Sequence, residues 1–349
     1  MITKENYSKE HITQLQQESH ADPGIIERTL FAFGLLEALS AVGMDFTFKG
    51  GTSLILLLHA PKRLSTDIDI VVKPGTDIDD YIQKASSIFP FISGGEQERK
   101  KRGNIEKRHF KFYYQSPLRA ENQLYILLDV LFEENHYAQL IQKEISNELL
   151  LTSGENLKVW VPPVDCVLGD KLTAFAPYTT GIPLRQNKDL EVMKQFYDVG
   201  TLIDEHEDFE LLHRTYWDIS NTEIGYRDIP ITPADALLDT IQAAVCIGSR
   251  GKTRPEDFPS YLRGSRDIQQ HIFESRFSME TASRMAPKVI YMAACLLTGH
   301  PYKVIDDPQP FKAEALHDTR LTQMKTFRKI DPVAYGYLIQ ADRLLSGLN

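Results

Sequence analysis

The 349-residue sequence has few cysteines and no long apolar run. Cys166, Cys246 and Cys295 are odd in number and lack His or Cys partners at ligand spacing, so neither a disulfide framework nor a zinc site is indicated. The longest apolar runs, 54–58 and 289–297, are at most about half of a membrane span. The first 20 residues contain no apolar core typical of a signal peptide. We therefore expect a cytoplasmic protein without membrane insertion.

The sequence also lacks an excess of basic residues. It contains 39 Lys and Arg residues and 48 Asp and Glu residues, which give a net charge of −9. This charge disfavours unspecific coating of nucleic acid and leaves only a confined basic groove for that purpose. Hydrophobic residues make up 42% and charged residues 25%, which are values of an ordinary folded chain. At this length we expect two domains.

The first half of the chain alternates between strand-like and helix-like segments. Asp22-Pro23 resembles a helix start, and apolar residues then follow at helical spacing. The pattern next predicts a strand, a helix, a strand, a helix and two further strands, at Phe46–Lys49, Ser53–His59, Asp67–Val72, Asp77–Phe89, Arg108–Tyr114 and Tyr125–Phe132. The predicted fold class is α/β (α+β), with a minimal mixed sheet of about four strands and its helices.

The sequence changes character around Trp160–Pro163, where strand-like alternation gives way to helical patterns. Apolar residues recur at three-to-four spacing in four later segments, Val164–Ala176, Leu190–Ile203, Pro233–Ile247 and Ala282–Leu297. We therefore predict a catalytic domain at 1–160 and a mostly helical domain at 161–349.

The first group of candidate site residues is Lys49-Gly50-Gly51-Thr52-Ser53, between a predicted strand and a predicted helix. Glycines without side chains allow backbone N–H groups to approach a polyphosphate, and the following helix presents its positive N-terminal end to that anion. Thr52 and Ser53 can add hydroxyl donors. The alternative is an ordinary turn, which a Gly-Gly pair by itself usually marks.

The second group is Arg63, Ser65 and the pair Asp67 and Asp69, followed by an Ile-Val-Val strand. Strand side chains alternate, so the two aspartates are predicted to share one face and to bind Mg²⁺ through carboxylate oxygens. Asp129 is the candidate for a third carboxylate, because a lone acid in Leu127–Leu131 is costly to bury without a cation or a hydrogen-bond partner.

An Asp-x-Asp triplet by itself is weak evidence for a metal site, because such triplets also occur by chance. Asp77-Ile78-Asp79 is a second such triplet, but it follows Pro74-Gly75 and opens a predicted helix, where acidic residues suit the helix dipole. The glycine turn, Arg63 and the strand context distinguish Asp67 and Asp69 from it.

A basic stretch at 99–102 and 107–111 stands out from the acidic chain. Basic residues beside aromatics could hold an RNA backbone and stack bases. A solvated hairpin tip is the simpler interpretation and the one we favour. The ten histidines show no ligand or triad spacing, and we assign them no chemistry.

Together, Lys49–Leu54 and Arg63–Ile70 resemble the AbiEii/AbiGii toxin family of nucleotidyltransferases, in the polymerase-beta-like superfamily. The family joins a glycine turn, an arginine, a serine and paired aspartates at near-fixed spacing. The resemblance covers roughly residues 20–205. Further along, Asp170-Lys171 and Asp198 match family positions, although Gln195 replaces a family aspartate. The resemblance implies that Lys171 is a triphosphate ligand and that Asp198 belongs to the nucleotide site.

The resemblance implies a Mg²⁺-dependent enzyme that transfers NMP from an NTP to an acceptor hydroxyl. We expect Arg63 and Ser65 to orient the phosphates or the Asp67 and Asp69 pair. The acceptor in the family includes the 3′ end of tRNA, and the protein would be the toxin of a type IV toxin–antitoxin or phage-defence pair with a winged-helix antitoxin encoded nearby. Two alternatives remain open. One is an enzyme of this fold that modifies a small molecule or a protein. The other is a non-catalytic nucleotide-binding protein, which the intact Asp67, Asp69 and Asp129 disfavour.

Overall fold

The computed structural model describes residues 1–19, 21–97, 106–273 and 276–347. The chain forms two compact units. Unit 1 comprises Met1–Pro163 and Gln270–Arg276, and unit 2 comprises Val164–Gln269 and Phe277–Asn349.

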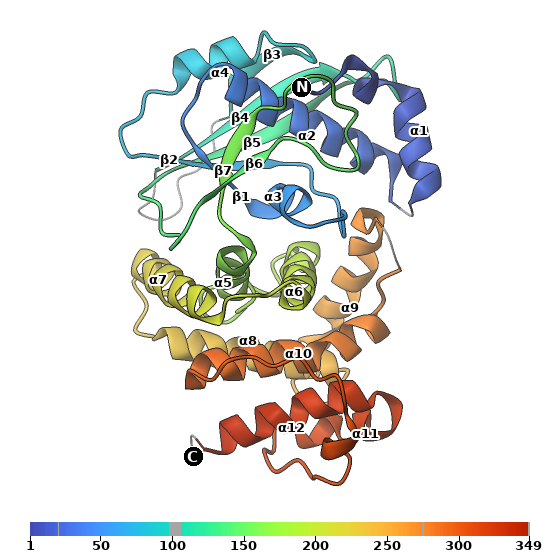
Figure 1. Cartoon of the computed structure of the whole chain (residues 1–349), viewed down its shortest axis with the longest axis vertical. Helices are drawn as coiled ribbons and strands as arrows, with labels where there is room; N and C mark the ends of the chain where they lie inside the picture. Colours follow the sequence, from blue (N-terminus) through green and yellow to red (C-terminus); the bar gives the residue numbers. More distant parts are fainter. Residues whose placement is uncertain (20, 98–105, 274–275, 348–349) are drawn as a thin grey trace. The chain divides into compact units, whose positions relative to one another are not determined.

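Unit 1 is built on a mixed sheet, which contains seven strands in the described residues, in the order β3-β4-β5-β2-β1-β7-β6 (Figure 1). Strands β2 and β5 are parallel, as are β1 and β7, whereas the other neighbours are antiparallel. The strands are β1 (Thr47–Lys49), β2 (Ile68–Val72), β3 (Phe91–Glu96), β4 (Glu106–Gln115), β5 (Gln123–Phe132), β6 (Ile141–Glu144) and β7 (Lys158–Val161). This arrangement confirms the predicted fold class.

The predicted number of about four strands is wrong, because β3, β6 and β7 were not foreseen. Strand β3 contains two glycines and is exposed at every residue after Phe91, so it lacks the alternation that identifies a half-buried strand. Strands β6 and β7 have only four residues each, which is too short for a periodic signal. The predicted strands at β1, β2, β4 and β5 are confirmed, with ends that differ by one or two residues.

One face of the sheet carries the core of unit 1. Phe48, Ile70 and Leu128 are fully buried on this face, and helix α2 (Pro23–Ala41) packs against β2 and β5. The predicted start of α2 is confirmed, since the Asp22 carboxylate accepts hydrogen bonds from the N–H groups of Gly24 and Ile25. Most of α2 is apolar around its whole circumference, as expected for a buried helix. Along the central strands, the residues that alternate with Phe48, Ile70 and Leu128 point to the opposite face of the sheet.

Three shorter helices complete unit 1, together with the 3₁₀ turn η1 (Lys4–Tyr7): α1 (Lys9–Glu18), α3 (Gly50–Leu57) and α4 (Asp79–Ala85). Helix α3 begins at Gly50, three residues before its predicted start, so the glycine pair forms the first turn of the helix. The helix predicted over Asp77–Phe89 is shorter than expected, because it ends at Ala85, before the Phe89-Pro90 bond.

Among the described residues of unit 2, the regular elements are all helices. The four helices predicted there are confirmed as α5 (Val164–Ala174), α6 (Asp189–Asp204), α8 (Pro233–Gly248) and α10 (Met279–Thr298). The others are α7 (Phe209–Arg227), α9 (Phe258–Asp267), α11 (Phe327–Ile330), α12 (Pro332–Ser346), η3 (Gln309–Phe311) and η4 (Thr322–Met324), while η2 (Ile268–His271) spans the unit boundary. In the described part of the chain no helix combines the length and the apolar character that crossing a bilayer requires.

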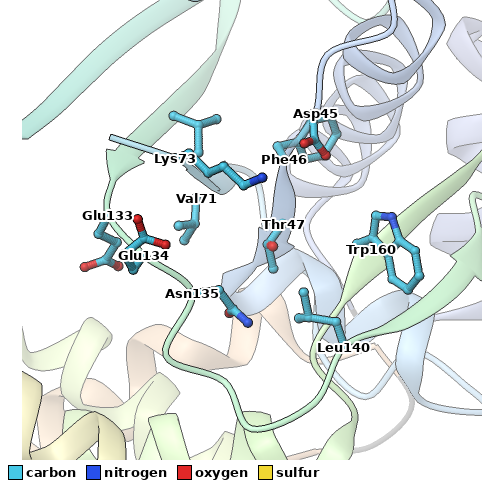
Figure 2. Close-up of a pocket in the computed structure, with 11 residues that line it drawn as sticks. Asp45, Phe46, Thr47, Val71, Lys73, Glu133, Glu134, Asn135, Leu140 and Trp160 are labelled. Carbon is cyan, nitrogen blue, oxygen red and sulfur yellow. The ribbon is translucent and has the colours of Figure 1, made fainter. Parts of the chain in front are cut away.

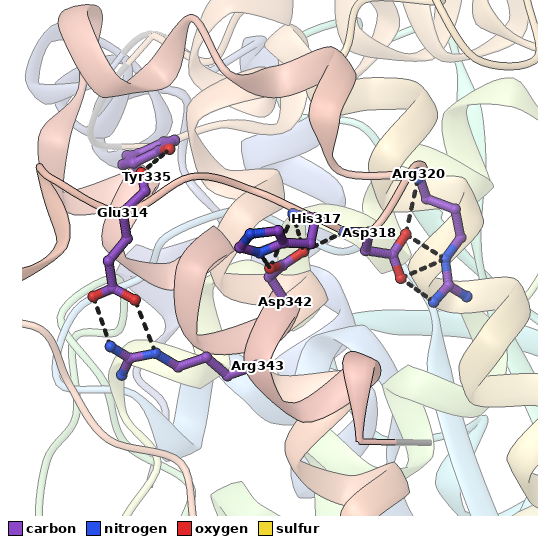
Figure 3. Close-up of polar contacts among 7 residues, drawn as sticks. All are labelled: Glu314, His317, Asp318, Arg320, Tyr335, Asp342 and Arg343. Carbon is purple, nitrogen blue, oxygen red and sulfur yellow. Dashed lines mark hydrogen bonds and ion pairs between the residues drawn. The ribbon is translucent and has the colours of Figure 1, made fainter. Parts of the chain in front are cut away.

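The last helix, α12, is tied to the preceding loop through Asp342 (Figure 3). The Asp342 carboxylate is buried and accepts hydrogen bonds from the backbone N–H groups of His317 and Asp318, the latter at 2.6 Å. The neighbouring ion pair between Arg343 and Glu314 is far more exposed, since 51% of the Arg343 side chain is accessible. Asp342 therefore holds the loop, whereas Arg343 adds little stability.

Replacing Asp342 should destabilise unit 2 measurably. Asp342→Ala leaves two amide groups without their acceptor, and we expect the free energy of unfolding to fall by roughly 1–3 kcal/mol. The matched control Arg343→Gln, one residue later on the same helix, should cost less than about 1 kcal/mol. Urea unfolding followed by circular dichroism measures both, and equal losses in the two variants would contradict this account.

Candidate active site

The register of four strands places a row of polar side chains on the sheet face opposite the core. Lys49 of β1 is the partner of Asp69 of β2, Asp69 is the partner of Asp129 of β5, and Asp129 is the partner of His109 of β4. Partner residues on adjacent strands point to the same face, with backbones about 4.8 Å apart. The structure thus brings together Asp69 and Asp129, which are 60 residues apart in the sequence.

Asp67 lies one residue before β2 and is exposed, so strand alternation fixes the direction of Asp69 but not of Asp67. The main chain at Asp67 is instead held by α3, because the Thr52 hydroxyl donates to the Asp67 carbonyl at 2.6 Å. The Thr66 hydroxyl also lies 3.4 Å from the Asp67 carboxylate. The glycine turn and the aspartate segment are therefore one connected structure.

The glycine turn is shaped around Asp69. Gly50 has a φ of +82°, and a Cβ atom at this position would lie 2.1 Å from Oδ2 of Asp69. A Cβ atom at Gly51 would meet Nη2 of Arg63 at 2.7 Å and Oγ of Ser65 at 2.9 Å. Both glycines thus allow close approach, and Asp69, Arg63 and Ser65 gather at the N-terminus of α3.

Thr52 and Ser53 were expected to offer hydroxyl donors to phosphate. Both side chains are buried, and their hydroxyl groups donate to the carbonyls of Asp67 and Gly50, the latter at 2.8 Å. A hydroxyl has one proton, so in this arrangement neither group can also donate to a ligand. The donors suited to an anion here are the main-chain N–H groups in the first turn of α3.

Arg63 is buried beside the turn, with 5% of its surface accessible, and its Nη1 donates to the Leu64 carbonyl at 3.2 Å. Ser65 is anchored through its main chain, because its carbonyl accepts a 2.9 Å hydrogen bond from the Thr29 hydroxyl of α2. These contacts give Arg63 and Ser65 a role in positioning the loop before Asp67. A direct contact of Arg63 or Ser65 with phosphate stays a prediction.

His109 is the member of the row that sequence reasoning missed. Its Nδ1 lies 2.7 Å from Oδ1 of Asp129, and both side chains are partly buried, at 17% and 31% exposed. The hydrogen bond orients the Asp129 carboxylate and leaves Oδ2 outside this contact. Spacing along the chain could not reveal the pair, because it depends on the pairing of β4 with β5.

The donor chemistry of the row fits Mg²⁺, which prefers carboxylate oxygens in combination with water and substrate phosphates. Within the described ranges, however, no three His, Cys, Asp or Glu side chains gather closely enough to hold a metal ion by themselves. Asp69 and Asp129 lie on adjacent strands with Asp67 beside them, so a Mg²⁺ ion bound here would depend on water and phosphate oxygens as further ligands.

In unit 2, the structure brings together the two residues predicted there to bind nucleotide. Nζ of Lys171 on α5 lies 2.9 Å from Oδ2 of Asp198 on α6, and Gln195 accepts a hydrogen bond from the same ammonium at 3.1 Å. Only 9% and 1% of the Lys171 and Asp198 side chains are exposed. The pair therefore joins α5 to α6, and its contact with triphosphate stays a prediction.

A pocket of about 310 Å³ lies on the same sheet face, beginning at the cross-strand pair Thr47 and Val71, two residues along the strands from Lys49 and Asp69. Figure 2 shows Lys73 reaching over it, with Trp160 on one side. Its lining contains three acidic residues, Asp45, Glu133 and Glu134, and one basic residue, Lys73. This balance disfavours a triphosphate, so the glycine turn remains the better anion site.

The basic stretch is only partly described, since residues 99–102 lie outside the described residues. Arg108 is bound by carboxylates on both sides, at 2.7 Å from Glu96 and 2.8 Å from Asp79, and these contacts raise the pKa of Arg108, with the Glu96 hydrogen bond as the largest cause. Phe110 is buried in the core and cannot stack on a base. Because Asp79, from the second aspartate triplet, forms an ion pair with Arg108, its role is structural.

A double-mutant cycle tests the contact between Gly50 and Asp69. Gly50→Ala should lose about 1–2 kcal/mol from its positive φ and roughly 1–3 kcal/mol more from the collision with the carboxylate. In an Asp69→Ala background the second loss should shrink. Gly75→Ala is the control, because Gly75 has a φ of +78° with no atom within 4 Å of its added Cβ. Urea unfolding of the set gives the coupling, and additive losses would contradict the contact.

Comparison with known proteins agrees with this geometry. A family model described as Nucleotidyl transferase AbiEii toxin, Type IV TA system, matches residues 34–258, which is more than half of the chain. No curated protein matches the sequence. The matched range includes the glycine turn, the row of strand residues and the Lys171–Asp198 pair, and it confirms the resemblance inferred from the sequence. The chain belongs to the AbiEii family of nucleotidyl transferase toxins of type IV toxin–antitoxin systems.

Proposed function

We propose that this nucleotidyl transferase transfers NMP from an NTP to a hydroxyl at the 3′ end of an RNA such as tRNA, in a Mg²⁺-dependent reaction. The observation that carries the proposal is the row formed by Lys49, Asp69 and Asp129 beside a glycine turn. Paired carboxylates next to a helix N-terminus combine a cation site with an anion site, which is what a metal–triphosphate complex requires.

Each residue near the row has a distinct part in this proposal. Asp67, Asp69 and Asp129 would hold Mg²⁺, which when bound neutralises the charge that develops on the phosphate oxygens. The main-chain N–H groups following Gly50 receive the anionic phosphates, and His109 keeps the Asp129 carboxylate in its orientation. The acceptor hydroxyl releases its proton to solvent and its oxygen forms a bond to the α-phosphorus, as the bond to the leaving pyrophosphate breaks in line.

Membership of a toxin–antitoxin family implies an antitoxin partner. We propose that this antitoxin is a winged-helix protein encoded next to the toxin, that the pair acts in phage defence, and that the toxin works in the cytoplasm. The three cysteines are buried as free thiols, which suits a reducing compartment.

Asp69→Asn should abolish nucleotide transfer and leave the fold intact, because the change removes a charged ligand from a partly exposed site without altering core volume. The matched control is Asp77→Asn in the second aspartate triplet, which should retain near-normal transfer. Incubation of each variant with every labelled NTP, Mg²⁺ and total RNA, followed by electrophoresis, measures the outcome.

Near-normal transfer by folded Asp69→Asn would overturn the assignment of Asp69. Label that appears on protein or on a small molecule, instead of on RNA, would retain the enzyme class and replace the proposed acceptor.

A further inference from the structure

A partly exposed aromatic cluster lies on the same sheet face as the carboxylate row, over β4 and β5. Tyr113 and Tyr125 are cross-strand partners with ring centroids 5.9 Å apart at 66°. Nζ of Lys111 lies 4.2 Å above the Tyr125 ring, and 44% of Tyr125 is exposed. The proposed chemistry at Asp69 and Asp129 leaves this cluster without a role.

The cluster is not part of the hydrophobic core. The alternate residues on these two strands, Phe112 and Ile126, are almost fully buried on the other face. Cross-strand aromatic pairs do stabilise sheets, by roughly 0.2–1 kcal/mol, but this gain does not require exposure of one ring or a lysine above it. A lysine above an exposed tyrosine, on a chain of net charge −9, instead forms a local basic and aromatic surface.

The order of strands places this surface on the acceptor side of the reaction. Across the sheet, the order is β1 with its glycine turn, β2 with Asp69, β5 with Asp129, and then β4. In the proposed reaction pyrophosphate leaves toward the glycine turn on the β1 side, so an in-line nucleophile would approach from the side of β5 and β4. Tyr125 precedes Asp129 by four residues on β5, which is about 13 Å along the strand on the same face.

We propose that Tyr113, Tyr125 and Lys111 bind the single-stranded 3′ end of the acceptor RNA. Unpaired bases stack on the tyrosine rings, with Tyr125 as the main contact, and Lys111 meets the backbone phosphate beside them. This surface holds the strand a few nucleotides from the reacting hydroxyl, so that the hydroxyl reaches Asp129. The inference rests on the proposed RNA acceptor and adds the residues that recognise it.

Binding of a short, fluorescently labelled single-stranded RNA to the full chain, without NTP, tests the surface by fluorescence anisotropy. Tyr125→Ala should raise the Kd roughly tenfold, which is the loss expected for one stacked base. Tyr125→Phe keeps the ring and should bind like the original protein. Trp160→Ala is the matched control, because Trp160 is 43% exposed on the same sheet face but lies on β7, beyond the glycine-turn strand.

Steady-state kinetics adds a readout that a purely structural role would not change. In Tyr125→Ala the KM for RNA should rise while the KM for NTP stays constant. In the binding assay, the original protein should bind a blunt-ended hairpin more weakly than the single-stranded RNA. Unchanged RNA affinity in Tyr125→Ala, or an equal loss in Trp160→Ala, would overturn the inference. If the original protein transfers no nucleotide but still binds RNA through Tyr125, the proposed reaction fails and the surface stands.

Discussion

The register of β2 between β1 and β5 is the constraint on which the site depends. Ile68 and Ile70 are fully buried, and their burial fixes which face Asp69 occupies. A shift of one residue would turn Asp69 into the core and expose the two isoleucines, at a cost that includes an unpaired buried charge. The hydrophobic effect therefore positions the carboxylates, although none of them is itself part of the core.

The glycine turn adds a second constraint, since it couples the start of α3 to the same strand. Gly50 leaves room for the Asp69 carboxylate, and the Thr52 hydroxyl ties the helix to the main chain at Asp67. Arg63 fills the space beside Gly51. The anion site and the carboxylates are thus built from one packed unit, in which the position of each part limits the position of the other.

Local patterns in the sequence were sufficient for the features that depend on neighbouring residues. Asp22-Pro23 identified the start of α2, and the β-branched run at Asp69 and the apolar run around Asp129 identified two central strands. The sequence could not reveal the pairing of β5 with both β2 and β4, so the contact of Asp129 with His109 was missed. Strand β3 was missed because it is almost entirely exposed. Lys171 and Asp198 were both predicted as site residues, but their contact was missed because helix packing brings them together.

The most direct test of the account is a crystal structure of the full chain with Mn²⁺ in place of Mg²⁺ and a non-hydrolysable triphosphate. We expect an anomalous peak within about 2.0–2.3 Å of oxygens from Asp67 or Asp69, with Asp129 beside it and the phosphates at the first turn of α3. A metal and triphosphate bound elsewhere, away from the row of Lys49, Asp69 and Asp129, would contradict the account.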